Sequence, residues 1–334
     1  MKTSIVILNW NGSEMMRRFL PSVLRHSSGA EVVVADNASS DDSLAMLAAE
    51  FPRVRTIVLD KNYGFAEGYN RALKNIDSEY TVLLNSDVEV EESWLTPMEE
   101  YMDRHKDVAA CQPKILSYAE NTQFEYSGAA GGFVDCYGYP YCRGRLFATV
   151  EKDHGQYDSV MDIHWATGAC MMVRTRLFYS CGAFDSRFFA HNEEIDLCWR
   201  FRLFGYRITC VPQSRVYHVG GGTLPQGNPR KVYLNFRNNL LMLYKNLPDS
   251  DLRRVMAIRL VLDYVAVVQS LVKGDLQGAR AILRARHDFH AMKKDYVPSR
   301  QKIQRRAANG CRLTSPCSVL FRYFIVRKRY FSQL

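Results

Sequence analysis

A carboxylate follows directly on a run of five strand-forming residues. Residues 80–84 read Tyr-Thr-Val-Leu-Leu, and the chain continues through Asn85 and Ser86 to Asp87, with Glu89 two residues further on. Such an apolar run predicts a buried strand of a parallel sheet, and the residues after such a strand lie at the sheet edge where α/β proteins bind ligands. One or two carboxylates together with substrate phosphates commonly hold Mg²⁺. Asp87 is therefore a candidate metal ligand, and an exposed acidic turn is the alternative.

Three further predicted strands also end in polar residues. We expect these strands at residues 5–8, 31–35 and 55–59. The polar residues that follow them are Asn9, Asn11, Asp36 and Asn62. In a parallel sheet these ends converge on one crevice. Asp36 and its neighbour Asn37 have the chemistry to hydrogen-bond a nucleobase edge or ribose hydroxyls, although each of them alone is also a common turn residue.

The stretches between these strands have helical spacing. Helices are expected at residues 13–25, 41–51 and 64–75, with Ser13 as a candidate N-cap. Strands that alternate with helices predict an α/β fold with a doubly wound, mostly parallel sheet flanked by helices. Residues 117–160 lose the periodicity and indicate an irregular excursion with short strands near the substrate. Beyond it we expect a turn and a helix within 188–203, and long helices at 233–247 and 252–272.

A second acidic cluster lies in the second half of the chain. Glu193, Glu194 and Asp196 stand close together, and carboxylates in the first turn of a helix are favoured by its dipole. The functional alternative is a general base, which takes the proton of an attacking hydroxyl. His218 ends another β-rich run, before a loop of Gly220, Gly221 and Gly222. It is a candidate third ligand of the metal site or a structural residue.

The glycine-rich signatures of other nucleotide-binding folds are missing from this sequence. No Gly-x-Gly-x-x-Gly follows the first strand and no Walker sequence occurs, which disfavours a Rossmann dehydrogenase or a P-loop enzyme. Residues 4–12, 34–43, 62–70 and 83–88 resemble the nucleotide-sugar half of family 2 glycosyltransferases of GT-A fold. Residues 165–170, 188–200 and 218–222 resemble the acceptor half of the rhamnosyltransferase-like bacterial branch of that family. The resemblance spans about residues 3–247 in order.

The resemblance implies donor and metal contacts at the strand ends. The residues that it makes contacts of the donor nucleotide are Asn9, Asn11, Asp36, Asn62, Asn85 and Asp87. Asp87 is also the metal-binding member of the Asp-x-Asp motif, with His218 as a supporting ligand of a divalent cation, Mg²⁺ or Mn²⁺. The first Asp of this motif is Asn85 here, whose amide still hydrogen-bonds ribose or metal-bound water.

The resemblance also implies residues for catalysis and for the acceptor. Glu194 takes the place of the general base, and Trp165 lies along the acceptor site. The usual Glu-Asp pair is Glu193-Glu194 in this chain, so Glu193 stays open as an alternative base. The implied reaction is an inverting, metal-dependent transfer of a sugar, with dTDP-rhamnose as the first expected donor. The implied acceptor is a glycan or a lipid-linked glycan at the cytoplasmic face of the membrane.

Charge divides the chain into two parts. Residues 230–334 carry 22 Lys and Arg against 6 Asp and no Glu, a net +16, and residues 1–229 carry 22 Lys and Arg against 29 Asp and Glu, a net −7. We therefore expect a glycosyltransferase domain at 1–229, with halves at about 1–115 and 116–229, and a basic helical extension at 230–334. An anionic partner fits that extension, either a membrane surface or, less favoured, a nucleic acid. Residues 321–331 mix aromatic and cationic side chains, which suits a membrane interface; packing on the chain's own domain is the alternative.

Two further features bear on location. The nine cysteines include no Cys-x-x-Cys pair, which fits a reducing cytosol, and the apolar start of the chain is too short for a signal peptide. No run of 18 uncharged apolar residues occurs, so we expect no clear membrane-spanning helix, and a processive synthase is disfavoured. We expect a protein on the inner face of the cell membrane. The remaining alternatives are a non-catalytic sugar-nucleotide binder and a nucleic-acid-binding protein.

Overall fold

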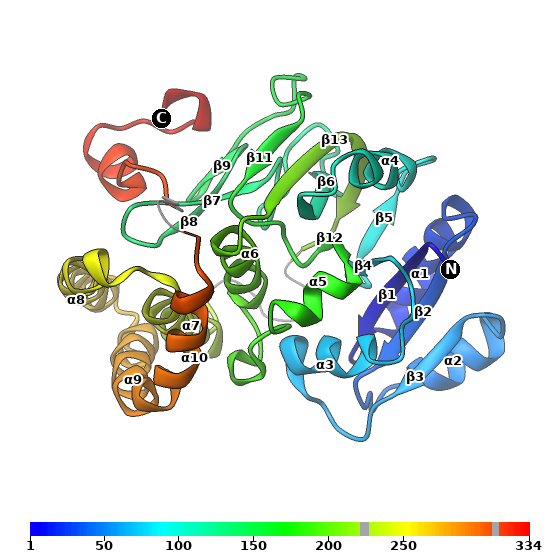
Figure 1. The fold of residues 1–334 in the computed structure, drawn as a ribbon, viewed down its shortest axis with the longest axis horizontal. Coiled ribbons are helices and arrows are strands. Elements are labelled where there is room, and N and C mark those ends of the chain that lie inside the picture. The colour runs from blue at the N-terminus through cyan, green and yellow to red at the C-terminus, as the bar shows by residue number, and fades with distance from the viewer. Residues whose placement is uncertain (221–226, 309–313) are drawn as a thin grey trace.

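A computed structural model describes residues 1–220, 227–308 and 314–334 of the chain (Figure 1). The predictions made for Gly221, Gly222 and Cys311 lie outside these residues. The described part contains one large sheet, one small sheet and a group of helices that follows both sheets in the sequence.

The large sheet has nine strands and positions the candidate site. Its order is β11-β13-β6-β12-β4-β1-β2-β3, and β5 pairs with β13. The strands are β1 (Thr3–Asn9), β2 (Glu31–Asp36), β3 (Arg55–Val58), β4 (Tyr80–Leu84), β5 (Val88–Val90), β6 (Val108–Ser117), β11 (Met161–Ile163), β12 (Cys170–Arg174) and β13 (Arg207–His218). Strands β1 to β4 pair in parallel, as predicted, whereas β12 runs antiparallel between β4 and β6. The sheet is therefore mixed and mostly parallel in its first half.

Helices cover both faces of this sheet (Figure 1). They are α1 (Ser13–His26), α2 (Ser43–Glu50), α3 (Gly64–Leu73), α4 (Thr96–Arg104), α5 (Thr175–Ser180) and α6 (Glu193–Leu203). Alternate residues of β1 enter two different hydrophobic clusters, with Val6 in one and Ile5 and Ile7 in the other, as the period of two in a strand requires. All five residues of β4 are buried, as the apolar run predicted.

One capping prediction is wrong. Ser13 is the first residue of α1 and makes no side-chain cap, because Gly12 occupies the N-cap position. The carboxylate of Asp41 instead accepts the Ser13 amide proton at 3.1 Å. The free amide at the start of α1 is therefore satisfied by a side chain from another part of the chain.

The irregular stretch predicted at 117–160 contains a small antiparallel sheet. Its strands are β7 (Gly132–Val134), β8 (Pro140–Cys142), β9 (Arg145–Leu146) and β10 (Thr149–Val150). The end of the chain packs on this sheet: the Val319 amide donates to Asp135 at 3.0 Å, and the Thr149 and Tyr323 hydroxyls lie 2.8 Å apart. The expected interfacial segment 321–331 thus forms one short π-helix and docks partly on its own domain, while Phe321 and Phe324 stay exposed.

The remaining helices form the basic extension. They are α7 (Pro229–Asn246), α8 (Asp249–Val272), α9 (Leu276–Met292) and α10 (Val297–Arg306). Lys245 of α7 makes a buried ion pair with Asp196 of α6 at 2.9 Å, and Asn246 donates to the same carboxylate at 2.8 Å. Asp196, one of the three clustered acidic residues, therefore joins the extension to the sheet domain.

Over residues 255–272, helix α8 turns its two charged residues inward and most of its large apolar residues outward. Arg259 and Asp263 are buried and paired at 3.3 Å, and Arg286 of α9 contacts the other oxygen of Asp263 at 2.5 Å. The exposed apolar residues are Leu260, Val261, Tyr264, Val265, Val268, Leu271 and Val272. By length and composition α8 is sufficient to cross a membrane, so the expectation of no such helix is corrected. The helix contains no uninterrupted apolar run of that length, because Arg259 and Asp263 lie within its apolar stretch.

Candidate active site

The ends of β1 and β2 bring together two of the predicted donor contacts. Asn9 and Asp36 are in register, and the Asn9 amide donates to Asp36 Oδ1 at 3.1 Å. The other oxygen of Asp36 accepts from the Ser39 amide at 2.9 Å. Both side chains are fully buried, so they brace the strand ends. The Asn9 Oδ1 atom lacks a hydrogen-bond partner in the described structure, and a Cβ on Gly12 would lie 2.6 Å from it.

Two more of the predicted donor contacts, Asn11 and Asn62, order the neighbouring loops. Asn11 has φ 52° and its Oδ1 accepts from the Ser40 amide at 2.7 Å. Asn62 Oδ1 accepts from the Gly64 amide at 2.8 Å and from the Asn37 side chain at 3.2 Å. These bonds fix the backbone at the carboxyl ends of β1 to β3, where ligands of α/β sheets bind.

Asp87 lies beside His218, as predicted. The His218 Nε2 atom is 3.1 Å from Asp87 Oδ1 and 3.4 Å from Nδ2 of the Asn85 side chain. Its other ring nitrogen lies 3.4 Å from the buried carboxylate of Glu125. Burial alone would lower the pKa of His218, but the contacts with Asp87 and Glu125 raise it to about 10. Burial opposes ionisation of Asp87, yet the histidine keeps the pKa of Asp87 below its usual value.

The two candidate bases open helix α6. Burial raises the pKa of Glu194 to about 7, although the backbone amides of Gly168 and Ile195 favour its charged form. Burial and the neighbouring Glu194 raise the pKa of Glu193 well above its usual value. One carboxylate oxygen of each residue is buried without a hydrogen-bond partner in the described structure. A carboxyl group with a pKa near the working pH suits general-base catalysis.

The loop before β12 connects Glu194 to the Asp87 end of the sheet. The Gly168 amide bonds to Glu194, and the next residue, Ala169, accepts from the Asn85 amide at 3.0 Å. Gly168 packs so tightly on Phe65 that an added Cβ would lie 2.8 Å from the ring. Adjoining residues of one loop therefore contact the predicted base and Asn85, which lies two residues before the predicted metal ligand Asp87.

The comparisons with known proteins agree with this arrangement. The family model described as Glycosyl transferase family 2 matches residues 4–180, more than half of the chain. The chain belongs to glycosyl transferase family 2. The family predicted from the motifs is thereby confirmed.

This family 2 glycosyltransferase is similar to two curated bacterial proteins and to one solved structure. The N-acetylglucosaminyl-diphospho-decaprenol L-rhamnosyltransferase of Mycobacterium tuberculosis is 24% identical over 64% of this chain and 75% of its own length. The O-antigen biosynthesis protein RfbC of Myxococcus xanthus is 26% identical over 65% of this chain and only 17% of its own length. These similarities agree with the rhamnosyltransferase-like branch. The structure of GalNAc-T7 with UDP, GalNAc and Mn²⁺ superposes with a TM-score of 0.57 at 16% identity, over 73% of this chain and 48% of that chain, which confirms the GT-A fold.

The backbone just before the two glutamates of this glycosyltransferase is strained. Phe189, His191 and Asn192 have φ of 65°, 72° and 70°, in the left-handed region that non-glycine residues rarely adopt. Asn238 of α7 holds this segment, because its amide donates to the carbonyl oxygens of Phe188, Ala190 and His191 at 3.0, 2.9 and 2.7 Å. Strain of this kind gathers at functional sites.

Trp165 lies in the packed core. Its indole nitrogen donates to the Phe133 carbonyl at 2.9 Å, its ring closes on Gly132, and 4% of the residue is exposed. Contact between this residue and an acceptor stays a prediction.

A divalent cation fits the Asp87 end of the sheet. Within the described residues, no group of three or more His, Cys, Asp or Glu is arranged to hold a metal, so the protein would offer Asp87 and His218 alone. In this arrangement the positive charge between Asp87 and Glu125 is a proton on His218. A divalent cation would supply positive charge at the same place, and two protein ligands plus substrate phosphates suffice for Mg²⁺.

The sequence analysis missed Glu125 and Asn238. Glu125 sits in the irregular stretch and becomes visible only through its contact with His218. Asn238 lies within a helical stretch of α7 with no motif of its own. In each case the functional position depends on a partner about 50 or more residues away, and neither residue belongs to a local motif.

Proposed function

We propose that this glycosyltransferase transfers a sugar, with inversion, from a nucleotide-diphosphate sugar to a hydroxyl of a glycan or lipid-linked glycan. The observation that carries the proposal is the Glu194 carboxyl, whose pKa burial raises to about 7. Its partner Gly168 directly precedes Ala169, whose carbonyl oxygen accepts from the backbone amide of Asn85, two residues before Asp87. The carboxylate of Glu194 accepts the acceptor proton while the hydroxyl oxygen forms a bond to the anomeric carbon. The bond from that carbon to the diphosphate breaks, and its electron pair leaves with the nucleoside diphosphate.

The other residues hold and orient the reactants. Asp87 and His218 would hold a divalent cation, and a bound cation would neutralise negative charge on the departing diphosphate. Asn9, Asp36 and Asn62 order the strand ends on which the nucleotide lies. The strained backbone before Glu193 fixes the direction of the carboxylates, and Asn238 maintains it.

The proposed donor and acceptor follow the relatives. Rhamnose, carried by dTDP, is the first candidate sugar, because the name of the mycobacterial relative states an L-rhamnosyltransferase. The same name states an N-acetylglucosaminyl-diphospho-decaprenol acceptor, which supports a lipid-linked acceptor here. The product would enter cell-surface polysaccharide at the inner face of the cell membrane.

The exposed apolar face of helix α8 supports peripheral binding to an anionic membrane. Its outward face is apolar, with Val265 59% and Val272 83% exposed, and the surrounding region carries a net charge of +16. Apolar side chains enter the headgroup boundary while cations meet anionic lipid. Flotation of the full chain with phosphatidylglycerol vesicles tests this. We expect Val261→Ser/Val265→Ser to weaken flotation, with Val58→Ser, an exposed valine of β3, as the matched control; equal flotation of all three proteins would contradict it.

The donor site is tested by a panel of nucleotide sugars, scored by thermal shift with and without Mn²⁺ and by release of nucleoside diphosphate. We expect one nucleotide sugar to raise the Tm only with Mn²⁺ present and to turn over with an acceptor. Stabilisation without turnover on any acceptor would identify a non-catalytic binder. No stabilisation by any sugar nucleotide, together with salt-sensitive binding to DNA or RNA, would identify the nucleic-acid alternative.

A further inference from the structure

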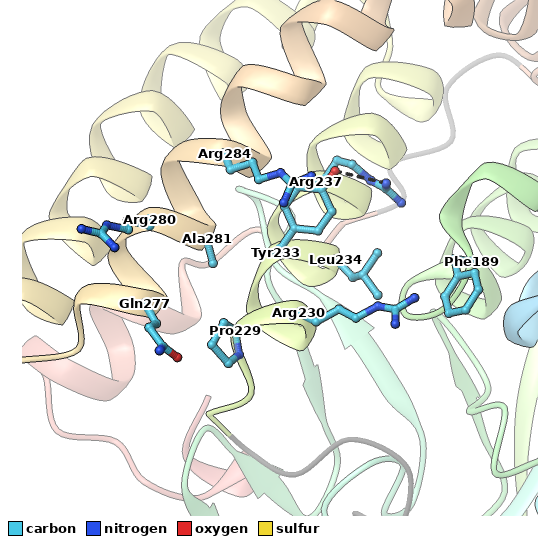
Figure 2. A pocket seen from close by; sticks show the side chains of 10 residues that line it. All are labelled: Phe189, Pro229, Arg230, Tyr233, Leu234, Arg237, Gln277, Arg280, Ala281 and Arg284. Carbon is cyan, nitrogen blue, oxygen red and sulfur yellow. Dashed lines mark hydrogen bonds between the residues drawn. The ribbon is translucent and has the colours of Figure 1, made fainter. Parts of the chain in front are cut away.

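A cavity of about 670 Å³ lies between helices α7 and α9 and is used by none of the steps above (Figure 2). Four arginines line it, Arg230 and Arg237 from α7 and Arg280 and Arg284 from α9, together with the aromatic rings of Phe189 and Tyr233. We call it the arginine cavity. Its volume is within the range of small-molecule sites.

The arginines of the cavity are poorly matched by carboxylates. Arg237 donates to the carbonyl oxygens of Arg187 and Phe188, which are neutral acceptors. Within the described ranges, Arg230 and Arg280 have no recorded ion pair, and the guanidinium of Arg230 lies over the Phe189 ring at 4.8 Å. Four cations with this little compensation form a site of net positive charge.

One carboxylate stands near the cavity, and it is shared. Asp288 lies 3.7 Å from Arg284 and accepts the Tyr233 hydroxyl proton at 2.6 Å. The guanidiniums of Arg284 and Arg237 lie 5.1 and 5.2 Å from the centre of the Tyr233 ring, so two cations gather around one aromatic face. Planar guanidinium groups donate in pairs to phosphate oxygens, which makes phosphate the anion that fits this lining best.

Phe189 connects the arginine cavity to the active site. A Cβ on Gly64 would lie 2.6 Å from the Phe189 ring, and the Phe189 carbonyl accepts the Ala66 amide proton at 3.1 Å, so this residue touches the nucleotide-sugar half. The same ring lines the cavity, four residues before Glu193. A ligand anchored in the cavity would therefore reach toward the proposed base.

We propose that the arginine cavity binds the diphosphate of a lipid-linked acceptor. This rests on the proposed function, and it assigns the acceptor as a phosphate-bearing lipid. Helix α9, which lines the cavity, packs on both α7 and α8, and α8 is the helix whose outer face is apolar. A diphosphate bound in the cavity would leave the lipid chain near α8 and the sugar near Phe189.

The first test measures binding of inorganic pyrophosphate to the full chain by equilibrium dialysis in EDTA, which silences a metal-dependent donor site. We expect the wild type to bind and Arg230→Gln/Arg280→Gln to bind at least about tenfold more weakly. Arg305→Gln, which removes an exposed charge of α10, is the control and should bind like the wild type. Equal binding by all three proteins, or no binding by the wild type, overturns the proposal.

The second test separates an acceptor diphosphate from bilayer headgroups. Transfer is measured with prenyl-diphosphate-linked N-acetylglucosamine and with octyl N-acetylglucosaminide, and flotation with phosphatidylglycerol vesicles. We expect the double variant to raise the KM at least about tenfold more for the diphosphate acceptor than for the octyl glycoside. Weaker flotation with equal changes in the two KM values would assign the arginines to headgroups and overturn the proposal. If the wild type transferred sugar to neither acceptor, the result would count against the proposed function. Binding of pyrophosphate would still test the cavity.

Discussion

The nucleotide-sugar half and the acceptor half treat their buried polar groups differently. In the first half both oxygens of Asp36 accept hydrogen bonds, and Asn37 bonds to Asn62 and to the backbone of the two residues that follow Asn62. In the second half Glu193 and Glu194 each bury an oxygen without a partner in the described structure, behind a strained backbone. The buried polar atoms of the first half are held by hydrogen bonds, except Asn9 Oδ1. The second half keeps unpartnered carboxylate oxygens and a strained backbone at the place where the chemistry is proposed.

The largest effect is expected at the point where the two halves meet. Asp87→Ala should reduce transfer by at least about 10³-fold, because it removes the motif's only carboxylate and with it several kcal/mol of charge stabilisation. Steady-state rates with saturating donor and Mn²⁺ measure this, with Glu89→Ala as the matched control. A rate within tenfold of the wild type would mean that the metal site lies elsewhere.

Replacement of the unpartnered carboxylate should separate activity from stability. Glu194→Gln should lower the kcat by about 10²–10⁴-fold as a lost general base. Because the folded pKa of about 7 exceeds the usual 4.5, the folded state holds extra protons and the free energy of unfolding falls as the pH rises from 4.5 to 7. The Gln variant lacks this cost and should be more stable at pH 8 by about 1–3 kcal/mol. Rates and urea unfolding at pH 8 measure both effects; Glu193→Gln, if it alone abolishes turnover, would reassign the base.

The dependence of kcat on pH should be a smaller effect, and it reports directly on the ionisation of Glu194. Since the base must be ionised, the kcat should rise with pH through about 7, and at pH 6 it should be about tenfold below its plateau. A kcat that stays constant between pH 5.5 and 8 would contradict Glu194 as the base.

The smallest effects should distinguish two matched asparagines. Asn238→Ala leaves three carbonyl oxygens before Glu193 without their donor and should lower the kcat, whereas Asn37→Ala loosens the strand ends and should raise the KM for the donor. Each should cost about 1–3 kcal/mol of stability. The split between kcat and KM is the readout, and identical changes in both variants would remove the contrast between the two halves.

Local signals predicted much of the fold. The bounds of the strand Tyr80–Leu84 agree with the prediction at both ends. Where strands and helices alternate along a chain, a short apolar run bounded by polar residues indicates a buried strand. The family could be predicted from residues 4–12 and 83–88, because each of these motifs is contiguous in the sequence. The pairing of Asp87 with His218 followed from the resemblance, and the structure brings the two within 3.1 Å.

Features that depend on distant partners were not predictable. Ser13 was expected to cap its own helix, but Asp41 supplies the acceptor from another element. A helix at residues 252–272 is expected from its apolar-leaning composition, which does not say which face turns inward; the buried partners Arg286 and Asn239 decide that. Glu125 lacked any motif because its role is defined by His218 in the folded chain.

The anomeric configuration of the product tests the central claim most directly. ¹H NMR of the first product, formed from the nucleotide sugar that stabilises the protein, reports whether the sugar's configuration matches that of the donor. The proposed attack of an acceptor hydroxyl, with Glu194 as base, predicts the opposite configuration, and at least about 10²-fold less product from Glu194→Gln at equal times. Retained configuration, or undiminished product from the variant, would contradict the account.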